Sequence, residues 1–374
     1  MDKVKILHIV DGGFLGGGQA NILSICNNID ESRFDVAIAA KGGLAFEKEV
    51  RNSGYKFYPL ELPKILRSKY LKHLLKIQDK DNFDMVHSHG GVAGFYGRTL
   101  KKHVPEIKTV HTIHGIHYIN SENYFVKSIS KTIEQYLVQF TDMTICETQN
   151  DLKTAVDIRI ANPAKSVVIS NGINLSKYTN LKKNTALLKN LGLDESNFIV
   201  GNISRFDVQK NQKLIIQAAY YLIKKYPEMR FVLVGDGKTM NSMREYARDA
   251  NLGEYVIFTG EVNNLPDYYS IFDVFVLASF WEGMPYALLE AMAARKAIIC
   301  SKIPNLEEVI KTDYSALTMN PHDMDDLFRE ISALHDNTVL REKISQNAMI
   351  ESTQYDETEI VRKIEAVYMG VMDN

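Results

Sequence analysis

The chain contains few cysteines and no long apolar run, and each absence narrows its class. The three cysteines, Cys26, Cys146 and Cys300, lie in distant apolar segments, and their odd number excludes a disulfide framework or a zinc ribbon. No stretch approaches about 18 apolar residues, so we expect no membrane-spanning helix. The N-terminal apolar run meets glycines soon after residue 10, which is unlike a signal peptide. These features predict a cytoplasmic protein with reduced thiols.

A strong excess of one charge is also missing. The 374 residues include 44 Lys+Arg and 46 Asp+Glu, a net charge of −2 that is too balanced to indicate nucleic-acid binding. Residues 1–175 hold 22 basic and 18 acidic residues, and the remainder holds 22 and 28, so the first half is basic and the second acidic. The hydrophobic fraction of 45% and charged fraction of 24% exclude intrinsic disorder and collagen-like repeats. At roughly 150 residues per domain, the length suggests two domains.

Short β-branched runs recur with room for a helix between them. In the first half they fall at 4–10, 34–40, 83–89, 107–114, 143–148 and 166–170. After a polar stretch at 174–190, the alternation restarts with runs at 198–204, 230–237, 255–260, 274–279 and 297–301. Continuous apolar strands alternating with helices predict parallel sheets covered on both faces. We therefore expect two doubly wound, Rossmann-like α/β domains joined near residue 175, with ligands bound in the cleft between them.

A glycine-rich loop, DGGFLGGGQ, follows the first strand at 11–19. Its glycines Gly16, Gly17 and Gly18 let the backbone approach a ligand, and the next helix offers N–H groups to a phosphate. A dinucleotide fingerprint is excluded because Asn21 replaces its last glycine, and a P-loop because Gln19 replaces its lysine. A plain tight turn is the alternative.

Six of the ten histidines cluster in one part of the first half: His87, His89, His103, His111, His114 and His117. Side chains alternate along a strand, so His111 and His114 should face opposite sides of the sheet, and the carboxylate and cysteine ligands typical of zinc are missing. The pattern therefore favours hydrogen bonding to a ligand over metal binding. His114 and Gly115 are best placed for this, because they end a strand where the chain must turn.

In the second half, Arg205 ends a strand and Lys210 follows near the start of a helix. Arginine forks across oxygens and lysine adds a compact charge, so the pair suits two adjacent phosphates. Solvated surface charges are the alternative.

The stretch FWEGMPYALLEAM at 280–292 is the most informative. Gly283 and Pro285 mark a turn after a strand, and a helix should begin at Tyr286, so that N–H groups over 283–286, Met284 included, face an anion. Glu282 in the loop and Glu290 one turn into the helix would repel a phosphate, but they would accept hydrogen bonds from sugar hydroxyls beside it. Two surface glutamates are the alternative.

Together these segments resemble the retaining glycosyltransferase family 4, which has the GT-B fold of two facing Rossmann-like domains. Glu282 and Glu290 match its Glu-x7-Glu motif, and Arg205 and Lys210 match its Arg-x4-Lys motif. Segments GGGQA, MVHSHGGVAGFYGR, SNGIN, VLVGDG and VIFTG, with His114-Gly115, are also similar. Residues 294–297 lack the usual Gly-Lys-Pro and 303–308 lack a usual glycine, which leaves the donor's identity open.

The resemblance implies transfer of a sugar from a nucleotide-diphosphate donor with retention, to a glycan or lipid-linked acceptor in cell-surface polysaccharide or glycoconjugate synthesis. UDP is favoured over GDP, and no cofactor or metal is expected. Arg205, Lys210 and the N–H groups of 283–286 would stabilise the leaving nucleotide. Glu290 would hold the ribose, Glu282 the donor sugar and His114 the sugar near its reacting carbon. Gly16, Gly17 and Gly18 would also contact the donor, and the acceptor would contact His87, His89, Gly115 and His117.

The resemblance also sets the expected division of the chain. Residues 1–175 would form the acceptor domain, 176–354 the donor domain, and 355–374 a helix crossing back to the first domain. Residues 64–76 interleave cations with apolar residues at helical spacing, which predicts peripheral contact with the inner face of the cell membrane. An ordinary amphipathic surface helix is the alternative.

Two other functions fit the same pattern. A nucleotide-sugar epimerase of this fold would convert the nucleotide sugar without any acceptor. A noncatalytic nucleotide-sugar-binding subunit would bind the donor but would not depend on Glu282 for turnover.

Overall fold

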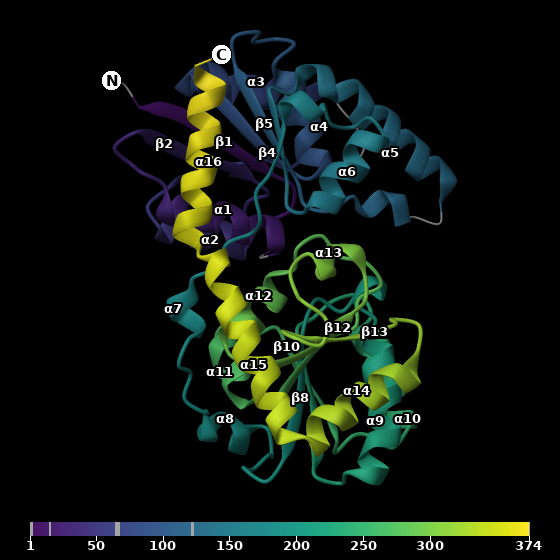
Figure 1. The fold of residues 1–374 in the computed structure, drawn as a ribbon. Coiled ribbons are helices and arrows are strands. Elements are labelled where there is room, and N and C mark those ends of the chain that lie inside the picture. The colour runs from purple at the N-terminus through teal and green to yellow at the C-terminus, as the bar shows by residue number, and fades with distance from the viewer. Residues whose placement is uncertain (1–2, 15, 64–67, 121–122, 374) are drawn as a thin grey trace. The chain divides into compact units, whose positions relative to one another are not determined.

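A computed structural model describes residues 3–14, 16–63, 68–120 and 123–373. The chain forms two compact units, the first comprising Met1–Gly172 and Glu357–Asn374 and the second Ile173–Asp356. Both are layered α/β structures, as the sequence predicts (Figure 1). The three cysteines are buried and form no disulfide.

The first unit is built on a seven-stranded parallel sheet in the order β3-β2-β1-β4-β5-β6-β7. Its strands are β1 (Val4–Val10), β2 (Phe34–Ala40), β3 (Lys56–Pro59), β4 (Met85–His89), β5 (Lys108–Ile113), β6 (Met143–Cys146) and β7 (Ser166–Val168). Successive residues of β1 point to opposite faces, so Ile6 and Val10 join one core while Leu7 and Ile9 join the other. The apolar runs are continuous because both faces are covered.

Helices cover both faces of this sheet. They are α1 (Gly17–Asn28), α2 (Ala45–Asn52), α3 (Ser68–Asp81), α4 (Gly91–Leu100), α5 (Tyr124–Leu137), α6 (Gln149–Asp157) and α16 (Glu357–Met372), with 3-10 turns η1 (His117–Asn120), η2 (Val138–Phe140) and η3 (Pro163–Lys165). Helices α1 and α16 share the core of Ile6 and Val10, and α3 and α4 share the core of Leu7 and Ile9. The C-terminal helix thus belongs to the first unit.

The second unit has a six-stranded parallel sheet in the order β10-β9-β8-β11-β12-β13. Its strands are β8 (Phe198–Ile203), β9 (Met229–Val234), β10 (Val256–Gly260), β11 (Val274–Leu277), β12 (Ala297–Ser301) and β13 (Leu317–Met319). Its helices are α7 (Leu175–Tyr178), α8 (Thr185–Asn190), α9 (Gln212–Lys225), α10 (Met240–Asp249), α11 (Leu265–Ile271), α12 (Tyr286–Ala293), α13 (Pro304–Glu307), α14 (Met324–Asp336) and α15 (Thr338–Ser352), with η4 (Val208–Lys210) and η5 (Thr353–Tyr355).

Each sheet has a point where the strand order reverses. In the first unit β1 lies between β2 and β4, and in the second β8 lies between β9 and β11. The connections on the two sides of such a strand leave in opposite directions, which opens a crevice at the carboxyl ends of the strands. Ligand-binding residues are therefore expected just after β1 and β4, and just after β8 and β11.

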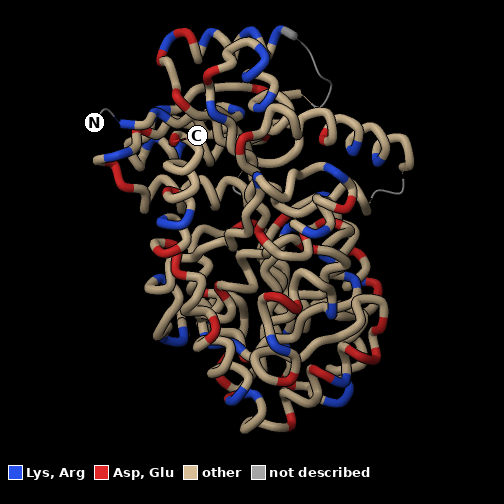
Figure 2. Tube along the Cα trace, turned by 45° about the horizontal axis from the view of Figure 1, so that its top comes forward, with Lys and Arg blue, Asp and Glu red and all other residues tan. Residues whose placement is uncertain are grey.

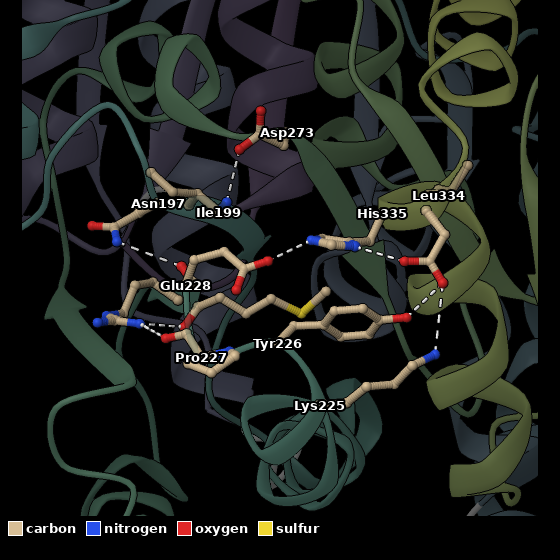
Figure 3. A network of polar contacts seen from close by, with 12 residues as sticks. Asn197, Ile199, Lys225, Tyr226, Pro227, Glu228, Asp273, Leu334 and His335 are labelled. Carbon is tan, nitrogen blue, oxygen red and sulfur yellow. Dashed lines mark hydrogen bonds and ion pairs between the residues drawn. The ribbon is translucent and has the colours of Figure 1, made fainter.

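A polar network closes the opposite, amino end of the second sheet (Figure 3). The imidazole of His335, near the end of α14, lies 2.7 Å from Glu228 and 2.9 Å from Asp336. Tyr226 donates to Asp336 over 2.7 Å. Hydrogen bonds from His335 and Tyr226 help to lower the pKa of the Asp336 carboxyl. Because Glu228 directly precedes β9, this network fastens α14 to the sheet and takes no part in the carboxyl-end sites.

No helix among the described residues is both long and apolar enough to cross a membrane. Of the basic segment at 64–76, residues 64–67 lie outside the described part of the chain, and the rest begins α3.

Candidate active site

Four neighbouring strands of the first unit end in polar residues at the same edge of the sheet. Asp11 follows β1, His89 ends β4, His114 follows β5 and Glu147 follows β6. The order β1-β4-β5-β6 places these strand ends side by side. Polar groups that are far apart in the sequence therefore gather beside the reversal point of the sheet.

His114 is held by partners on both ring nitrogens. Its Nδ1 lies 2.6 Å from Oε1 of Glu147, and its Nε2 lies 3.1 Å from Nδ1 of His89. Gly115, directly after it, has φ +78°, the left-handed conformation that turns the chain away from β5. The expectation that His114 and Gly115 end the strand is thus confirmed.

A row of buried rings continues behind His114. His89 Nε2 lies 3.0 Å from His8 Nδ1, and the Tyr368 hydroxyl lies 3.5 Å from His8 Nε2 and 2.6 Å from His87 Nδ1. His87 Nε2 lies 2.7 Å from the Thr112 hydroxyl. Burial lowers the pKa of His8 to about 3 and holds the pKa values of His87 and His89 well below their usual range. These three rings are therefore neutral near pH 7.

The structure gives His87 and His89 a different position from the one expected of acceptor ligands. Both are buried, and both nitrogens of each ring already have protein partners. They lie behind His114 as its support, and we assign them no direct contact with the acceptor. His117, which begins η1, is exposed.

His111 lies away from this row. Its Nδ1 contacts the hydroxyl of Ser88 at 3.0 Å, and its ring lies against Gly94 of α4. Burial, with a smaller contribution from the Arg98 charge, holds the pKa of His111 well below its usual range. His111 and His114 thus have separate surroundings, as strand alternation predicts.

The glycine-rich loop adjoins His114. Gly16 is the N-cap of α1, where no side chain caps the helix, and Gly17 begins that helix. A Cβ atom added at Gly18 would lie 3.6 Å from His114 Nε2. The first turn of α1 therefore lies against the imidazole of His114, and a side chain at position 18 would contact that ring.

Among the described residues, one histidine group has the close spacing of metal ligands: His8, His87 and His89, with a ligand atom of each within 4.8 Å of the others. Their nitrogens are hydrogen-bonded to one another and to Tyr368, Thr112 and His114. Metal binding there would have to displace those bonds inside a buried core.

In the second unit, Lys210 and Glu282 form a close ion pair. Lys210 Nζ lies 2.6 Å from Glu282 Oε1, and their side chains are only 15% and 5% exposed. Glu282 also accepts hydrogen bonds from the hydroxyl of Ser279 at 2.5 Å and from Gln209 at 3.4 Å. Lys210 ends η4, which follows β8, and Glu282 follows β11, so the pair spans the two strands at the reversal point.

The loop of Glu282 is also fixed through its backbone. Asn305, in α13, donates to the Glu282 carbonyl at 2.8 Å, and Gln209 donates to the Trp281 carbonyl at 2.7 Å. Helix α12 begins at Tyr286 with Pro285 as its N-cap, whose side chain offers no acceptor. Gly283 and Met284 are buried in the turn between them. A helix start without a side-chain cap is suited to an anion.

Arg205 lies on the same edge of the sheet with more freedom. Its side chain is 66% exposed, and its nearest carboxylate is that of Asp207 at 3.8 Å. A guanidinium that is free to move and a more buried ammonium are both suited to binding phosphate oxygens, so diphosphate binding by Arg205 and Lys210 stays a prediction.

Glu290 lies deeper, in the second turn of α12. Tyr178 donates to one of its carboxylate oxygens at 2.7 Å and Tyr269 to the other at 2.9 Å. Burial raises the pKa of Glu290, and the two tyrosine hydrogen bonds oppose that shift. Each oxygen keeps a further lone pair for a ligand hydroxyl.

The residues that support these sites were missed in the sequence: Glu147, His8, Thr112 and Tyr368 around the histidines, and Gln209, Ser279, Asn305, Tyr178 and Tyr269 around the glutamates. Position after a strand was a usable signal for Glu147, Ser279 and Asn305. Tyr178, Tyr269 and Tyr368 carry no such signal, because they lie in helices and not directly after a strand.

Comparisons with known proteins agree with this organisation. The family model of glycosyltransferase family 4 matches residues 15–177, and that of glycosyl transferases group 1 matches residues 183–350. The Escherichia coli UDP-Gal:alpha-D-GlcNAc-diphosphoundecaprenol alpha-1,3-galactosyltransferase is 28% identical, over 100% of this chain and 98% of that protein. A Campylobacter jejuni N,N'-diacetylbacillosaminyl-diphospho-undecaprenol alpha-1,3-N-acetylgalactosaminyltransferase is 26% identical, over 86% of each chain.

Solved structures share the fold. The Anabaena protein HepE in complex with UDP-glucose aligns with a TM-score of 0.85 at 19% identity, covering 98% of this chain and 99% of that one. WaaG, a glycosyltransferase involved in lipopolysaccharide biosynthesis, aligns with a TM-score of 0.76 at 13% identity, covering 96% and 98%. The fold is therefore GT-B, and the chain belongs to the group 1, family 4 glycosyltransferases.

Proposed function

We propose that this glycosyltransferase moves a sugar from a UDP-sugar to a lipid-linked acceptor, with retention of the anomeric configuration. The observation that carries the proposal is the ion pair of Lys210 and Glu282 at the reversal point of the second sheet. Glu282 of this pair lies just before α12, whose start has no side-chain cap. The two similar transferases that act on diphosphoundecaprenol-linked sugars support the acceptor class, and the UDP-glucose complex of HepE supports the nucleotide.

The second unit would hold the donor. Departure of the nucleotide builds negative charge on the diphosphate, which Arg205, Lys210 and the first N–H groups of α12 would stabilise. Glu282 would accept a hydrogen bond from the donor sugar, and Glu290 one from the ribose. In the first unit, His114 is the proposed sugar-contacting residue, and Gly16 to Gly18 leave room for the ligand.

Retention does not require a protein base. A phosphate oxygen of the departing nucleotide would take the proton of the acceptor hydroxyl as that hydroxyl attacks from the same face. The fixed cations would replace a metal ion, so we propose that transfer is independent of metals. Activity that persists in excess EDTA is the expected result, and complete loss restored by a divalent ion would contradict it.

The deciding experiment incubates the purified chain with each of several UDP- and GDP-sugars, with and without undecaprenyl-diphosphate sugars. NMR of the product would give the anomeric configuration. Glu282→Gln should abolish transfer, whereas Glu228→Gln, in the network of Figure 3, should retain it. Conversion of a nucleotide sugar without acceptor would support an epimerase instead. A noncatalytic subunit would be supported if the donor raised the melting temperature while Glu282→Gln left turnover unchanged.

A lipid-linked acceptor implies contact with a bilayer, and α5 has the surface for it. Its first two turns expose Tyr124 (75%), Phe125 (76%) and Ile129 (59%), with Lys127 also exposed. Such exposed aromatic and aliphatic groups beside lysine are typical of helices that lie in a membrane interface. Figure 2 shows that basic and acidic residues are interspersed along both units. The α5 surface is therefore distinguished from the rest by its exposed apolar groups and not by a separate basic patch.

The charges of α5 fit an anionic bilayer. Lys127 and Lys131 are its cations, and its one carboxylate, Glu134, is turned inward to Arg98 at 2.7 Å. The helix thus presents cations but no anion to solvent. We therefore propose that α5 contacts anionic lipid, in place of the expectation placed on residues 64–76.

Vesicle flotation tests this surface. The chain should float with vesicles of phosphatidylglycerol at low salt and release at high salt. Phe125→Ser with Ile129→Ser should abolish flotation, while Tyr221→Ser, which removes an exposed aromatic from α9, should not. Flotation unchanged by the α5 variant would overturn the assignment. A dimer in solution that the same variant dissociates would mean that a second copy covers α5 instead.

A further inference from the structure

The donor and acceptor of each hydrogen bond around His114 can be assigned by starting from Glu147, at one end of the row. A carboxylate only accepts, so ionised Glu147 requires His114 to donate from Nδ1. In its singly protonated form His114 has one N–H, so its Nε2 then accepts, and the donor is Nδ1 of His89. The same rule makes His89 Nε2 accept from His8 Nδ1.

The assignment continues to the other end of the row. His8 Nε2 must accept, and the Tyr368 hydroxyl is its donor at 3.5 Å. The oxygen of Tyr368 then accepts from His87 Nδ1, and His87 Nε2 accepts from the Thr112 hydroxyl. Every group takes one consistent role, and all four rings become the Nδ1–H tautomer. This is the opposite of the Nε2–H form that free histidine prefers.

We propose that Glu147 is a positioning residue that imposes the Nδ1–H tautomer on His114 and, through it, one donor direction on the row of His89, His8, Tyr368, His87 and Thr112. His114 Nε2 then accepts from His89 and carries no proton, so this nitrogen cannot donate a hydrogen bond to a sugar. The functional part of this inference rests on the proposed transferase activity, because it takes the ligand of His114 to be a sugar.

The other charged groups near the row leave this assignment in place. Arg98 lies on the other side of β4, where it is paired with Glu134 and bonded to the Gly94 carbonyl. His111 is turned to Ser88.

Nitrogen NMR of the full chain labelled with 15N-histidine tests the tautomers without any substrate. Long-range 1H–15N correlations distinguish protonated from bare ring nitrogens, and single His→Gln variants assign the signals. At neutral pH, His114, His89, His8 and His87 should each show a protonated Nδ1 and a bare Nε2. A protonated Nε2 on His114 would overturn the proposal.

Glu147→Gln is the critical variant, because an amide can donate as well as accept. It should give His114 and His89 a second, Nε2-protonated population, and kcat should fall roughly 10- to 100-fold, as for other partners that orient an active-site histidine. The donor KM should change little, and Glu147→Asp should restore part of kcat and the single tautomer. Lost activity with unchanged tautomers would overturn the positioning role.

Glu134→Gln is the matched control, since it removes a buried carboxylate of the same unit that pairs with Arg98. It should leave the four tautomers unchanged even if it lowers stability; a change in them would overturn the specific role of Glu147. Failure of the proposed function is distinguishable, because a wild-type chain with the expected tautomers but no transfer of any sugar would refute only that function.

Discussion

Lys210 and Glu282 form an ion pair of 2.6 Å in which neither side chain is more than 15% exposed. The pair joins the segment after β8 to the segment after β11, where the two strands diverge. Burying two charges costs desolvation energy, and the attraction between them offsets only part of that cost. Such a pair therefore adds little stability compared with apolar residues at the same positions. Its position at the carboxyl ends of these strands fits the proposed role in binding the donor better than a role in stabilising the fold.

Variants of this pair should separate stability from activity. Lys210→Met leaves the Glu282 charge buried and should lower the free energy of unfolding by about 3 kcal/mol. It should also reduce kcat by roughly 100-fold or more, as for loss of a group that stabilises developing charge. The double variant Lys210→Met, Glu282→Gln should regain most of the stability but no activity. Urea denaturation and initial rates measure both, and an active double variant would contradict the assigned roles.

Glu290 should make the stability of the fold depend on pH and should also contribute to UDP binding. Its folded-state pKa is raised, so the folded state retains the proton longer than the unfolded chain, and stability falls as pH rises above the ordinary value of 4.5. Glu290→Gln removes this dependence, so its melting temperature should decline less than that of the wild type between pH 4.5 and 7. Calorimetry should nevertheless show that the variant binds UDP more weakly than the wild type does. Unchanged UDP affinity would argue against a ribose contact.

Tyr178→Phe provides the counterpart, since it deletes the hydroxyl that donates to Glu290 and leaves the carboxylate in place. Loss of one partner of a buried carboxylate should cost about 1–3 kcal/mol of stability. UDP binding should weaken less than in Glu290→Gln, because the ribose acceptor remains. Equal or greater weakening would show that the tyrosine itself is the nucleotide contact.

Gly235 should tolerate no side chain. Its φ is +126°, and a Cβ atom there would lie 2.2 Å from the carbonyl oxygen of Ser204, directly before Arg205. Gly235→Ala should therefore displace the Arg205 segment, lower stability by at least about 2 kcal/mol and weaken UDP binding. Gly253→Ala is the control, since a Cβ atom there meets open space, and it should be nearly neutral. Denaturation curves of the two variants make the comparison, and equal stability would refute the close approach.

Lys296 should make stability depend on alkaline pH. Burial lowers its pKa to about 8, and its ammonium donates to the Phe272 carbonyl at 3.1 Å. Between pH 8 and its ordinary value of 10.5 the unfolded chain binds more protons, so stability should rise with pH by up to roughly 1 kcal/mol per unit. Lys296→Met should flatten this rise, measured as the difference in melting temperature from the wild type. A parallel pH profile for the two proteins would contradict the assignment.

Local sequence was enough to predict the parallel sheets, because apolar runs buried on both faces differ from the alternating pattern of half-exposed strands. It also located His114, Arg205, Lys210 and Glu282, since each follows a strand and the carboxyl ends of parallel strands share one edge. Glycine and proline marked the turn before α12 for the same local reason. The matches to the family motifs rest on these short segments.

What surrounds those residues depended on the tertiary structure. Tyr368 reaches His87 from a helix 281 residues away, and Tyr178 reaches Glu290 across 112 residues. His87 and His89 belong to a strand whose pattern fits ligand contact or burial equally well. Only the folded structure shows that both are buried, with His87 bonded to Tyr368 of α16 and His89 to His8 and His114. Propensity and periodicity act over a few residues, whereas hydrogen-bond partners and burial are set by which distant surfaces meet when the sheet is covered.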